Sequence, residues 1–99
     1  MEIEIPFMES FKDMMLTDKK VCTSRNKIYG DPGDTFKIFG AKFKLICVAE
    51  LPLDIVAEYF YTQEGCETPD NFRIVWVDLH PRKGWDPDQR VFTHFFTRV

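Results

Sequence analysis

Residues 90–99 read RVFTHFFTRV, and this run limits the possible folds more than any other part of the chain. Successive side chains of a β-strand point to opposite faces of the sheet, and here both faces would be largely apolar. A strand of this kind is buried on two sides. The chain therefore needs a sheet in which other elements cover both faces of the last strand.

Strand and helix patterns cover most of the remaining chain. Alternating or β-branched segments predict strands, and apolar residues three and four positions apart predict helices. The predicted strands are residues 2–7, 20–25, 35–39, 41–51 and 90–99, and the predicted helices are residues 8–17, 53–60 and 69–79. The two strands around Gly40 should form an antiparallel hairpin. Thr68 is the expected N-cap of the third helix, and Asp18 is the expected left-handed residue that ends the first.

The order of these segments differs from the regular strand–helix alternation of a doubly wound parallel sheet. It favours an α+β fold in which a small antiparallel, barrel-like sheet carries three helices. The chain has 99 residues, of which 44% are hydrophobic, so it has enough apolar side chains to fold but only enough length for one core. We therefore expect a single domain over residues 1–99.

Several classes of protein are excluded at this stage. No apolar run approaches the roughly 20 residues that span a bilayer, and the acidic N-terminus MEIEIPF lacks the features of a signal peptide. The three cysteines form no CxxC pair. His80 and His94 are not at metal-ligand spacing, and His94 is expected to be a packed, hydrogen-bonded core residue. The sequence predicts a cytoplasmic protein with reduced thiols, no metal, no cofactor and no membrane partner.

Positive charge is concentrated in one segment. The net charge is −3, but residues 19–27 contain Lys19, Lys20, Arg25 and Lys27 and no acidic residue. An acidic protein does not coat nucleic acid nonspecifically, whereas a local basic segment suits a small anionic ligand. The alternative is a strand with a solvated, lysine-bearing face, which is common at sheet edges.

The same segment holds the best candidates for chemistry. In a regular strand Lys20 and Thr23 point to opposite faces, so they meet in one cleft only if a turn precedes the strand. The residues TDKK supply such a turn. A lysine, a threonine hydroxyl and a carboxylate can act as base, nucleophile and orienting group. Glu64, in the loop after the second predicted helix, is the candidate carboxylate, although most loop carboxylates are simply solvated.

Three stretches of the chain together resemble the ASCH domain family of the PUA-like superfamily. They are FKDMMLTDKKVCTSR, YGDPGDTFKIFG and the later helix that ends in LHP before a buried last strand, so the similarity covers nearly the whole chain. The resemblance implies a PUA-like antiparallel β-barrel of about five or six strands with three helices, and a role in RNA metabolism. Members of the family recognise nucleic acid or single nucleobases in a cleft beside the barrel.

Some small bacterial members of this family are amidohydrolases that remove the acetyl group from N4-acetylcytidine. By position in the motif, the resemblance implies Lys20 as the base, Thr23 as the nucleophile and Glu64 as the orienting carboxylate. The chain departs from these enzymes by a second hydroxyl group at Ser24 and by the longer segment HPRKGWDPDQ.

Three functions therefore remain open. The first is a binding module for RNA, a nucleoside or a nucleotide, in which the ligand is contacted by Ser24, Arg25, Lys27, Tyr29 and Trp85. The cations would meet phosphate and the two aromatic rings would stack on a base, unless those rings fold back on the core. The second is hydrolysis of an acylated nucleoside, and the third is a structural partner domain. We expect a monomer, although the sequence does not decide the oligomeric state.

Overall fold

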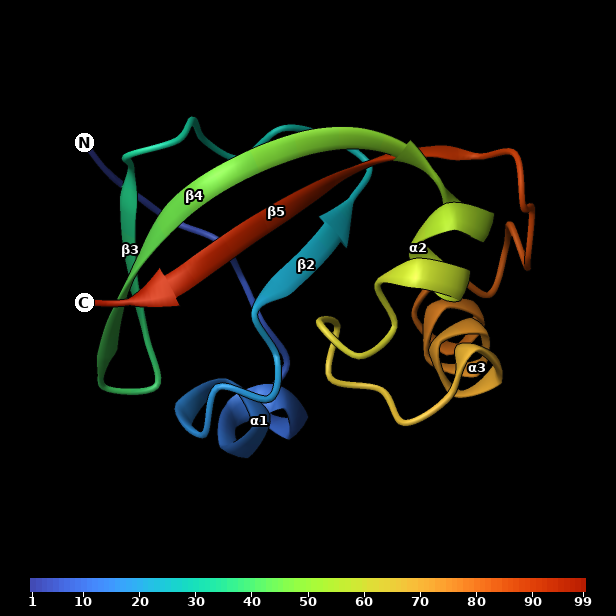
Figure 1. Ribbon diagram of the computed structural model, residues 1–99, viewed down its shortest axis with the longest axis horizontal. Helices are drawn as coiled ribbons and strands as arrows, with labels where there is room; N and C mark the ends of the chain where they lie inside the picture. The colour runs from blue at the N-terminus through green and yellow to red at the C-terminus, as the bar shows by residue number, and fades with distance from the viewer.

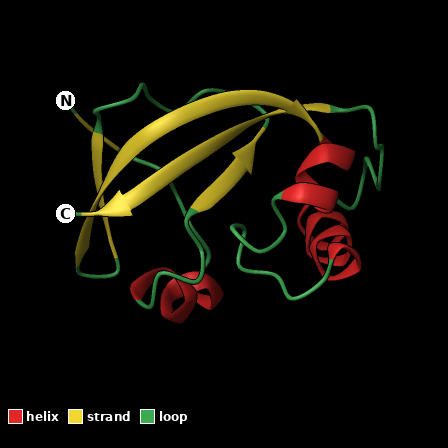
Figure 2. Ribbon diagram, viewed as in Figure 1, coloured by secondary structure: helices red, strands yellow, loops and turns green.

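The computed structural model describes residues 1–99 and consists of one curved sheet with helices packed against it (Figure 1 and Figure 2). The strands are β1 (Glu2–Ile3), β2 (Cys22–Arg25), β3 (Thr35–Ile38), β4 (Ala41–Pro52) and β5 (Arg90–Arg98). The helices are a 3-10 turn η1 (Glu9–Phe11), α1 (Lys12–Leu16), α2 (Leu53–Tyr59) and α3 (Pro69–Leu79). All predicted segments have a counterpart, but the first predicted strand, residues 2–7, is reduced to Glu2–Ile3 and the first predicted helix is divided into η1 and α1.

The five strands form one sheet in the order β1-β3-β4-β5-β2. β3 and β4 form the predicted antiparallel hairpin around Gly40, and β4 continues beside β5 as the longest strand (Figure 1). On β5, Val91 and Thr93 are buried on one face and Phe96 is buried on the other. The prediction that the last strand is covered on both faces is confirmed.

The predicted antiparallel barrel has to be corrected in two respects. β1 pairs with β3 in parallel, so the sheet is mixed. β1 and β2 are the outer strands and do not pair with each other, so the sheet is open. β1 is too short to extend an edge, and a loop covers the start of the outer edge of β2, since the N–H groups of Val21 and Cys22 both donate to the carbonyl oxygen of Gln63. An edge whose donors are already bonded cannot accept another strand.

The local sequence explains where α1 ends and where α3 begins. The Asn71 N–H donates to Thr68 Oγ1 at 3.0 Å, which is the predicted N-cap of α3. After α1, Asp18 adopts a left-handed φ of 61°, and the Lys19 N–H donates back to the Met14 carbonyl oxygen at 2.8 Å. This is the closing pattern of a Schellman motif. It turns the chain sharply toward β2, as the sequence predicted for residues 17–20.

The hydrophobic core consists of two clusters. One lies between α1 and the sheet and is formed by Ile5, Met15, Phe36, Phe43, Leu45 and Phe96. The other joins α2 and α3 to the start of β5 and is formed by Leu53, Val56, Ala57, Phe72, Trp76 and Val91. Figure 1 accordingly shows α1 below β2 and the α2–α3 pair beyond the end of β4. The helices therefore cover two different parts of the sheet.

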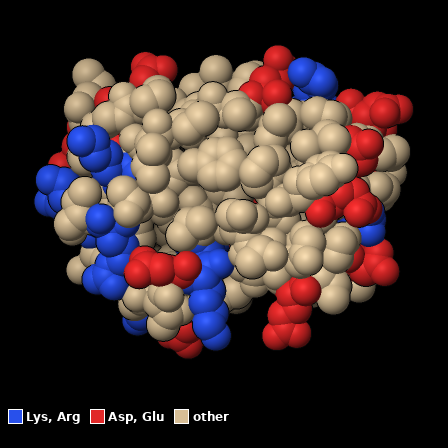
Figure 3. Space-filling model, in the orientation of Figure 1, with Lys and Arg blue, Asp and Glu red and all other residues tan.

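Charged side chains are unevenly distributed over the surface (Figure 3). Lys and Arg gather on the side of the β3–β4 hairpin, which carries the exposed Lys37, Lys42 and Lys44, whereas Asp and Glu gather on the side of α2 and α3. The basic segment 19–27 does not form a surface patch of its own, because Lys20 is buried and Arg25 is half-buried. Its charge is directed partly into the protein.

His94 is a core residue, as the sequence predicted. The side chain is fully buried, its Nε2 accepts the Tyr29 N–H at 3.0 Å, and its Nδ1 lies 2.9 Å from the Phe92 carbonyl oxygen. Because Nε2 is an acceptor, Nδ1 carries the proton and donates it to Phe92. Burial lowers the pKa of His94, and the nearby Arg25 guanidinium lowers it further. The folded protein therefore holds His94 in its neutral form.

Stability is expected to fall in mild acid, and His94 is expected to cause part of the fall. The folded-state pKa lies below the unfolded value of about 6.5, so the unfolded chain binds the proton more readily. The stability that neutral His94 contributes is present above about pH 6.5 and is lost as the pH falls through its folded-state pKa. Urea unfolding of wild type and His94→Gln at about pH 7.5 and about pH 5 measures this, with His80→Gln as the control. An equal loss of stability on acidification in wild type and His94→Gln would contradict it.

Candidate functional site

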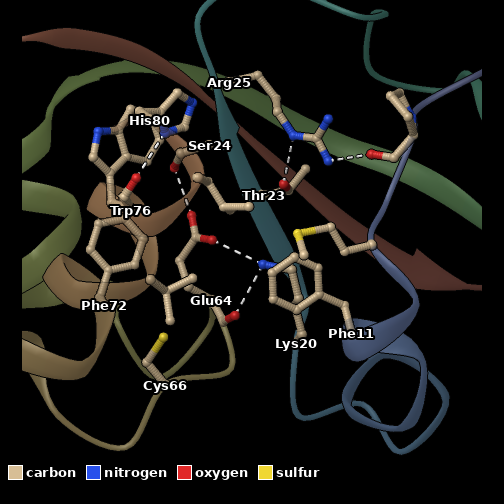
Figure 4. Close-up of a pocket in the computed structure, with 14 residues that line it drawn as sticks. Phe11, Lys20, Thr23, Ser24, Arg25, Glu64, Cys66, Phe72, Trp76 and His80 are labelled. Carbon is tan, nitrogen blue, oxygen red and sulfur yellow. Dashed lines mark hydrogen bonds and ion pairs between the residues drawn. The ribbon is translucent and has the colours of Figure 1, made fainter. Parts of the chain in front are cut away.

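A pocket lies between the two hydrophobic clusters, at the outer edge of β2 (Figure 4). Its cavity volume is about 260 Å³. Phe11, from the N-terminal segment, lies on one side of it, and Phe72 and Trp76, from α3, lie on the other. Between these walls, β2 and the loop after α2 supply the polar side chains. The pocket therefore combines aromatic walls with a polar interior.

An ion pair between Lys20 and Glu64 lies inside this pocket. Lys20 Nζ donates to Glu64 Oε1 and to the Glu64 carbonyl oxygen, both at 3.0 Å, and the two side chains are only 3% and 6% exposed. The same nitrogen lies 4.8 Å from the centre of the Phe11 ring. The three N–H groups of the ammonium thus face two oxygens and an aromatic ring. Removing either charge would leave the other buried without a counter-charge.

The loop after α2 brings Glu64 to Lys20. The Gln63 carbonyl oxygen accepts two N–H groups at the start of β2, so this loop is docked along the strand. Gly65 has a φ of +92°, and a Cβ atom at that position would lie 3.1 Å from the Lys20 Cβ and 3.0 Å from the Met14 Sδ. Only glycine allows this backbone conformation at so short a distance. Gly65 therefore permits the close approach that places the carboxylate beside the ammonium.

Ser24 holds the other oxygen of the carboxylate. Its Oγ donates to Glu64 Oε2 at 2.6 Å and lies 2.9 Å from Thr93 Oγ1, and both hydroxyl groups are buried. Charge-assisted hydrogen bonds of this length are among the stronger ones in proteins. Since one oxygen is bonded to Lys20 and the other to Ser24, the Glu64 carboxylate has a single fixed orientation.

Arg25 and Thr23 form the part of the pocket nearest the N-terminal segment (Figure 4). Arg25 Nε donates to Thr23 Oγ1 at 3.0 Å, and Nη2 donates to the Pro6 carbonyl oxygen at 2.6 Å. The guanidinium carbon lies 4.9 Å from the centre of the Phe7 ring and 5.4 Å from that of Tyr29. Because Thr23 Oγ1 accepts from Arg25, its own proton remains available to a ligand.

Lys20 and Thr23 line the same pocket, as the turn before β2 predicted. Lys20 precedes the strand, in the segment that leaves the Schellman turn, so the alternation of side chains along β2 does not apply to it. Thr23 and Ser24 are neighbours within the strand, yet both also line the pocket. The pocket lies beyond the outer edge of β2, next to the loop that covers the start of that edge, and side chains from both faces of an outer strand can reach it.

The two thiols at the site are not activated nucleophiles. Burial raises the pKa of the Cys22 thiol well above its usual value, and the Glu64 carboxylate raises it further. Burial also raises the pKa of Cys66, which lines the pocket. A thiol is nucleophilic as the thiolate, so a raised pKa keeps both groups unreactive near neutral pH.

Three of the predicted ligand-contacting residues lie outside this pocket. Lys27 Nζ lies 4.8 Å from the centre of the Tyr29 ring, and that ring packs edge-on against His94 at 6.0 Å. The Trp85 ring packs edge-on against Phe72 at 6.2 Å. Both aromatic rings are folded back on the core, which was the alternative interpretation of the sequence. Contact between a ligand and Lys27, Tyr29 or Trp85 remains a prediction.

The sequence interpretation missed the aromatic side of the pocket and the partner of Ser24. Phe72 and Trp76 belong to an apolar helical stripe, and spacing alone does not show that such residues also border a cavity. His80 stacks on Trp76 with ring centres 4.0 Å apart and lines the pocket as well. Thr93 lies in the middle of β5, where no sequence signal distinguishes it from an ordinary strand residue.

No group of three or more His, Cys, Asp or Glu side chains is arranged to hold a metal ion. None of the helices combines the length and the apolar character needed to cross a membrane.

Comparison with known proteins gives no match in sequence and clear matches in structure. No family model and no curated protein matches the chain. Among solved structures, an ASCH domain from Lactobacillus crispatus JV V101 aligns with 98% of this chain and 77% of its own, with a TM-score of 0.70 and 13% sequence identity. The chain has the fold of an ASCH domain.

Other solved structures share this ASCH fold with the chain. The hypothetical protein PH0355 aligns over 100% of both chains, with a TM-score of 0.76 and 14% identity. Protein EF3133 from Enterococcus faecalis V583 aligns with 91% of this chain and 70% of its own, with a TM-score of 0.65 and 18% identity. At these identities the likeness shows the fold, and the ASCH fold predicted from the sequence motifs is confirmed.

Proposed function

We propose that this ASCH-fold protein binds a nucleobase in the pocket at the edge of β2, as part of RNA or as a free nucleoside or nucleotide. The observation that carries the proposal is the pocket itself, in which aromatic rings on two sides face buried polar groups. Base rings stack on aromatic side chains, and hydrogen-bonding groups read the edges of an unstacked base. The resemblance to ASCH domains, which act in RNA metabolism, points to the same class of ligand.

The size and the polar groups of the pocket support a ligand of this kind. A volume of about 260 Å³ is at the small end of ligand-binding cavities, which favours one nucleoside-sized molecule over a larger one. Thr23 offers a free hydroxyl proton, and Arg25 offers further N–H groups. Glu64 is already bonded through both oxygens, so it acts mainly by fixing Lys20 and Ser24.

A screen of nucleosides, nucleotides and short RNAs by thermal unfolding tests the proposal. A bound ligand stabilises the folded state, by about 2.7 kcal/mol at a concentration one hundred times Kd. Val75 lines the pocket, so Val75→Trp is expected to fill it and to abolish the ligand-induced rise in Tm. Ile74 is adjacent in α3 but is 60% exposed and outside the pocket, so Ile74→Trp is the matched control and should respond like wild type.

Two results of this screen would count against base binding. One is that no nucleoside, nucleotide or RNA changes the Tm of the wild type. The other is that Val75→Trp, shown to be folded, responds to the ligand as strongly as Ile74→Trp does. In that case the ligand binds somewhere other than the pocket.

Hydrolysis of an acylated nucleoside is the second candidate, and a specific arrangement favours it. The Thr23 hydroxyl, the Lys20 amine and the Glu64 carboxylate line one pocket, and the lysine and glutamate are in direct contact at 3.0 Å. The ASCH amidohydrolases carry a lysine, a threonine and a glutamate at the matching motif positions. N4-Acetylcytidine is therefore the first substrate to examine.

No hydrogen bond joins Lys20 to Thr23, so this second candidate requires the bound substrate to bring the Thr23 hydroxyl within reach of the Lys20 amine. Lys20 first gives a proton to Glu64 Oε1, which already accepts its hydrogen bond. Thr23 Oγ then attacks the acetyl carbonyl carbon while the free Lys20 amine takes the hydroxyl proton. The amide C–N bond breaks as that proton passes to the leaving nitrogen, and water releases acetate from the acylated Thr23. Arg25, which donates to Thr23 Oγ1, positions the nucleophile.

A further inference from the structure

One lysine and one arginine line the pocket, and the arginine, Arg25, has no carboxylate partner. Lys20, the other, is paired with Glu64 at 3.0 Å, whereas no Asp or Glu oxygen lies within 4.0 Å of the Arg25 guanidinium nitrogens. Glu64 is the only acidic residue that lines the pocket, so two cations and one anion leave it with one positive charge. The protein as a whole is negatively charged, with a net charge of −3. The pocket is therefore positive within an acidic molecule.

The protein holds the Arg25 guanidinium in one place without neutralising it. Its faces lie near the rings of Phe7 and Tyr29, and its edges donate to Thr23 Oγ1 and to the Pro6 carbonyl oxygen. A guanidinium has five N–H groups, and these two hydrogen bonds use only two of them. The remaining N–H groups make no hydrogen bond within 3.5 Å in the protein, and the neighbouring Tyr29 hydroxyl only partly offsets the lowering of the Arg25 pKa by burial.

A half-buried charge of this kind is costly without a counter-ion. Burial lowers the pKa of Arg25, although an arginine stays protonated under all physiological conditions. The cost of desolvation is recovered when an anion accepts the free N–H groups, because hydrogen bonds between a guanidinium and a phosphate or carboxylate are charge-assisted. Fixed orientation adds to the effect, since little side-chain entropy remains to be lost on binding.

From these observations, and resting on the proposed function, we propose that the pocket takes a nucleotide rather than a nucleoside, with a phosphate group bound to the free N–H groups of Arg25. The base then occupies the aromatic part of the pocket, and the phosphate lies at the end formed by β2 and the N-terminal segment. The phosphate is either the 5′-monophosphate of a free nucleotide or a phosphodiester of an RNA strand. Both present the same anionic oxygens to the guanidinium.

The first test uses the wild-type protein and pairs of ligands that differ only in the phosphate. Each nucleoside is compared by calorimetry with its 5′-monophosphate and with a dinucleotide, and ribose 5-phosphate serves as the ligand without a base. The monophosphate or the dinucleotide is expected to bind roughly ten-fold or more tightly than the nucleoside, the gain typical of hydrogen bonds to a charged group. This advantage should shrink as salt is added, whereas nucleoside affinity should not change.

A variant locates the effect at Arg25. Arg25→Gln is expected to bind the nucleoside and the nucleotide with nearly equal affinity. Lys42→Gln is the matched control, because Lys42 is an exposed lysine of the β3–β4 hairpin that makes no ion pair and does not line the pocket. It removes the same charge and should keep the preference for phosphate. Unfolding of Arg25→Gln is measured in parallel, since Arg25 also holds Pro6 and Thr23.

The outcomes separate this inference from the proposed function. Equal affinity of nucleoside and nucleotide for the wild type overturns the phosphate site and leaves base binding standing. Equal affinity of ribose 5-phosphate and the nucleotide supports the Arg25 site and overturns base binding. A phosphate preference that persists in Arg25→Gln, or is lost in Lys42→Gln, places the phosphate elsewhere. Binding of none of these ligands overturns both proposals.

Discussion

Replacing Lys20 with arginine is expected to reduce hydrolysis of N4-acetylcytidine by roughly 10²- to 10⁴-fold. The affinity of the same protein for an RNA or nucleotide ligand should remain within about 1 kcal/mol of the wild type, because lysine and arginine both keep a positive charge beside Glu64. A guanidinium stays protonated near neutral pH, so it cannot take the proton of the Thr23 hydroxyl. The variant therefore separates a base from a mere positive charge.

Chromatographic turnover and ligand binding are measured on the same set of proteins. Lys20→Ala should impair both, since it leaves Glu64 buried and unpaired. Thr23→Val should abolish turnover and weaken binding only by the roughly 0.5–1.5 kcal/mol of one hydrogen bond. Turnover that survives Lys20→Arg rules out Lys20 as the base. If the wild type binds ligand but does not hydrolyse N4-acetylcytidine or a related acylated nucleoside, the protein is a binding module.

Breaking the buried ion pair is expected to have the largest effect on stability. Lys20→Met or Glu64→Gln should each lower the free energy of unfolding by roughly 3–5 kcal/mol, because each leaves one group in the interior without its partner. That is a large part of the roughly 5–15 kcal/mol that stabilises a typical domain. The cause is burial: the two side chains are 3% and 6% exposed, so water cannot replace the missing partner.

Urea unfolding of the two single variants and of the double variant, Lys20→Met with Glu64→Gln, measures the coupling between the two residues. The double variant should lose less than the two single losses combined, since it leaves no unpaired charge. The exposed pair of Lys37 and Glu2 is the control, since its side chains are 65% and 55% exposed, and Lys37→Met should leave the free energy of unfolding close to that of the wild type. Small and additive losses at Lys20 and Glu64 would show that water reaches the pair.

Much of the fold could be predicted because its elements depend on neighbouring residues. Thr68 caps α3 through the N–H of Asn71, three positions away, and Asp18 ends α1 with a left-handed φ of 61°. Gly40 joins the β3–β4 hairpin. The burial of both faces of β5 followed from its own composition. The caps and the hairpin are decided by contacts within a few residues, so the local sequence carries the information. The burial of β5 depends on distant elements, but its apolar composition requires such cover.

The arrangement of the strands could not be predicted in the same way. The parallel pairing of β1 with β3 joins residues more than thirty positions apart, and nothing in the short β1 segment specifies its partner. No further strand pairs with the start of β2, because the Gln63 carbonyl oxygen binds the N–H groups there. Gln63 belongs to the loop after α2, so this too depends on residues far along the chain. The order of the segments predicted an α+β fold and the resemblance added the ASCH family, but neither supplied these pairings.

The candidate site, like the fold, was predictable from the sequence only in part. The sequence by itself determined that a turn precedes β2 and which chemical groups are present. These are a lysine, hydroxyl groups and an arginine around β2, and a carboxylate in the loop after α2. Only the tertiary structure decided how they are paired: Lys20 with Glu64, Ser24 with the other oxygen of that carboxylate, and Arg25 with no carboxylate at all. The physical reason is distance along the chain. Residues 20 and 64 meet because Gly65 lets two backbone segments approach closely, and Arg25 forms no ion pair because no carboxylate oxygen lies within 4.0 Å of it.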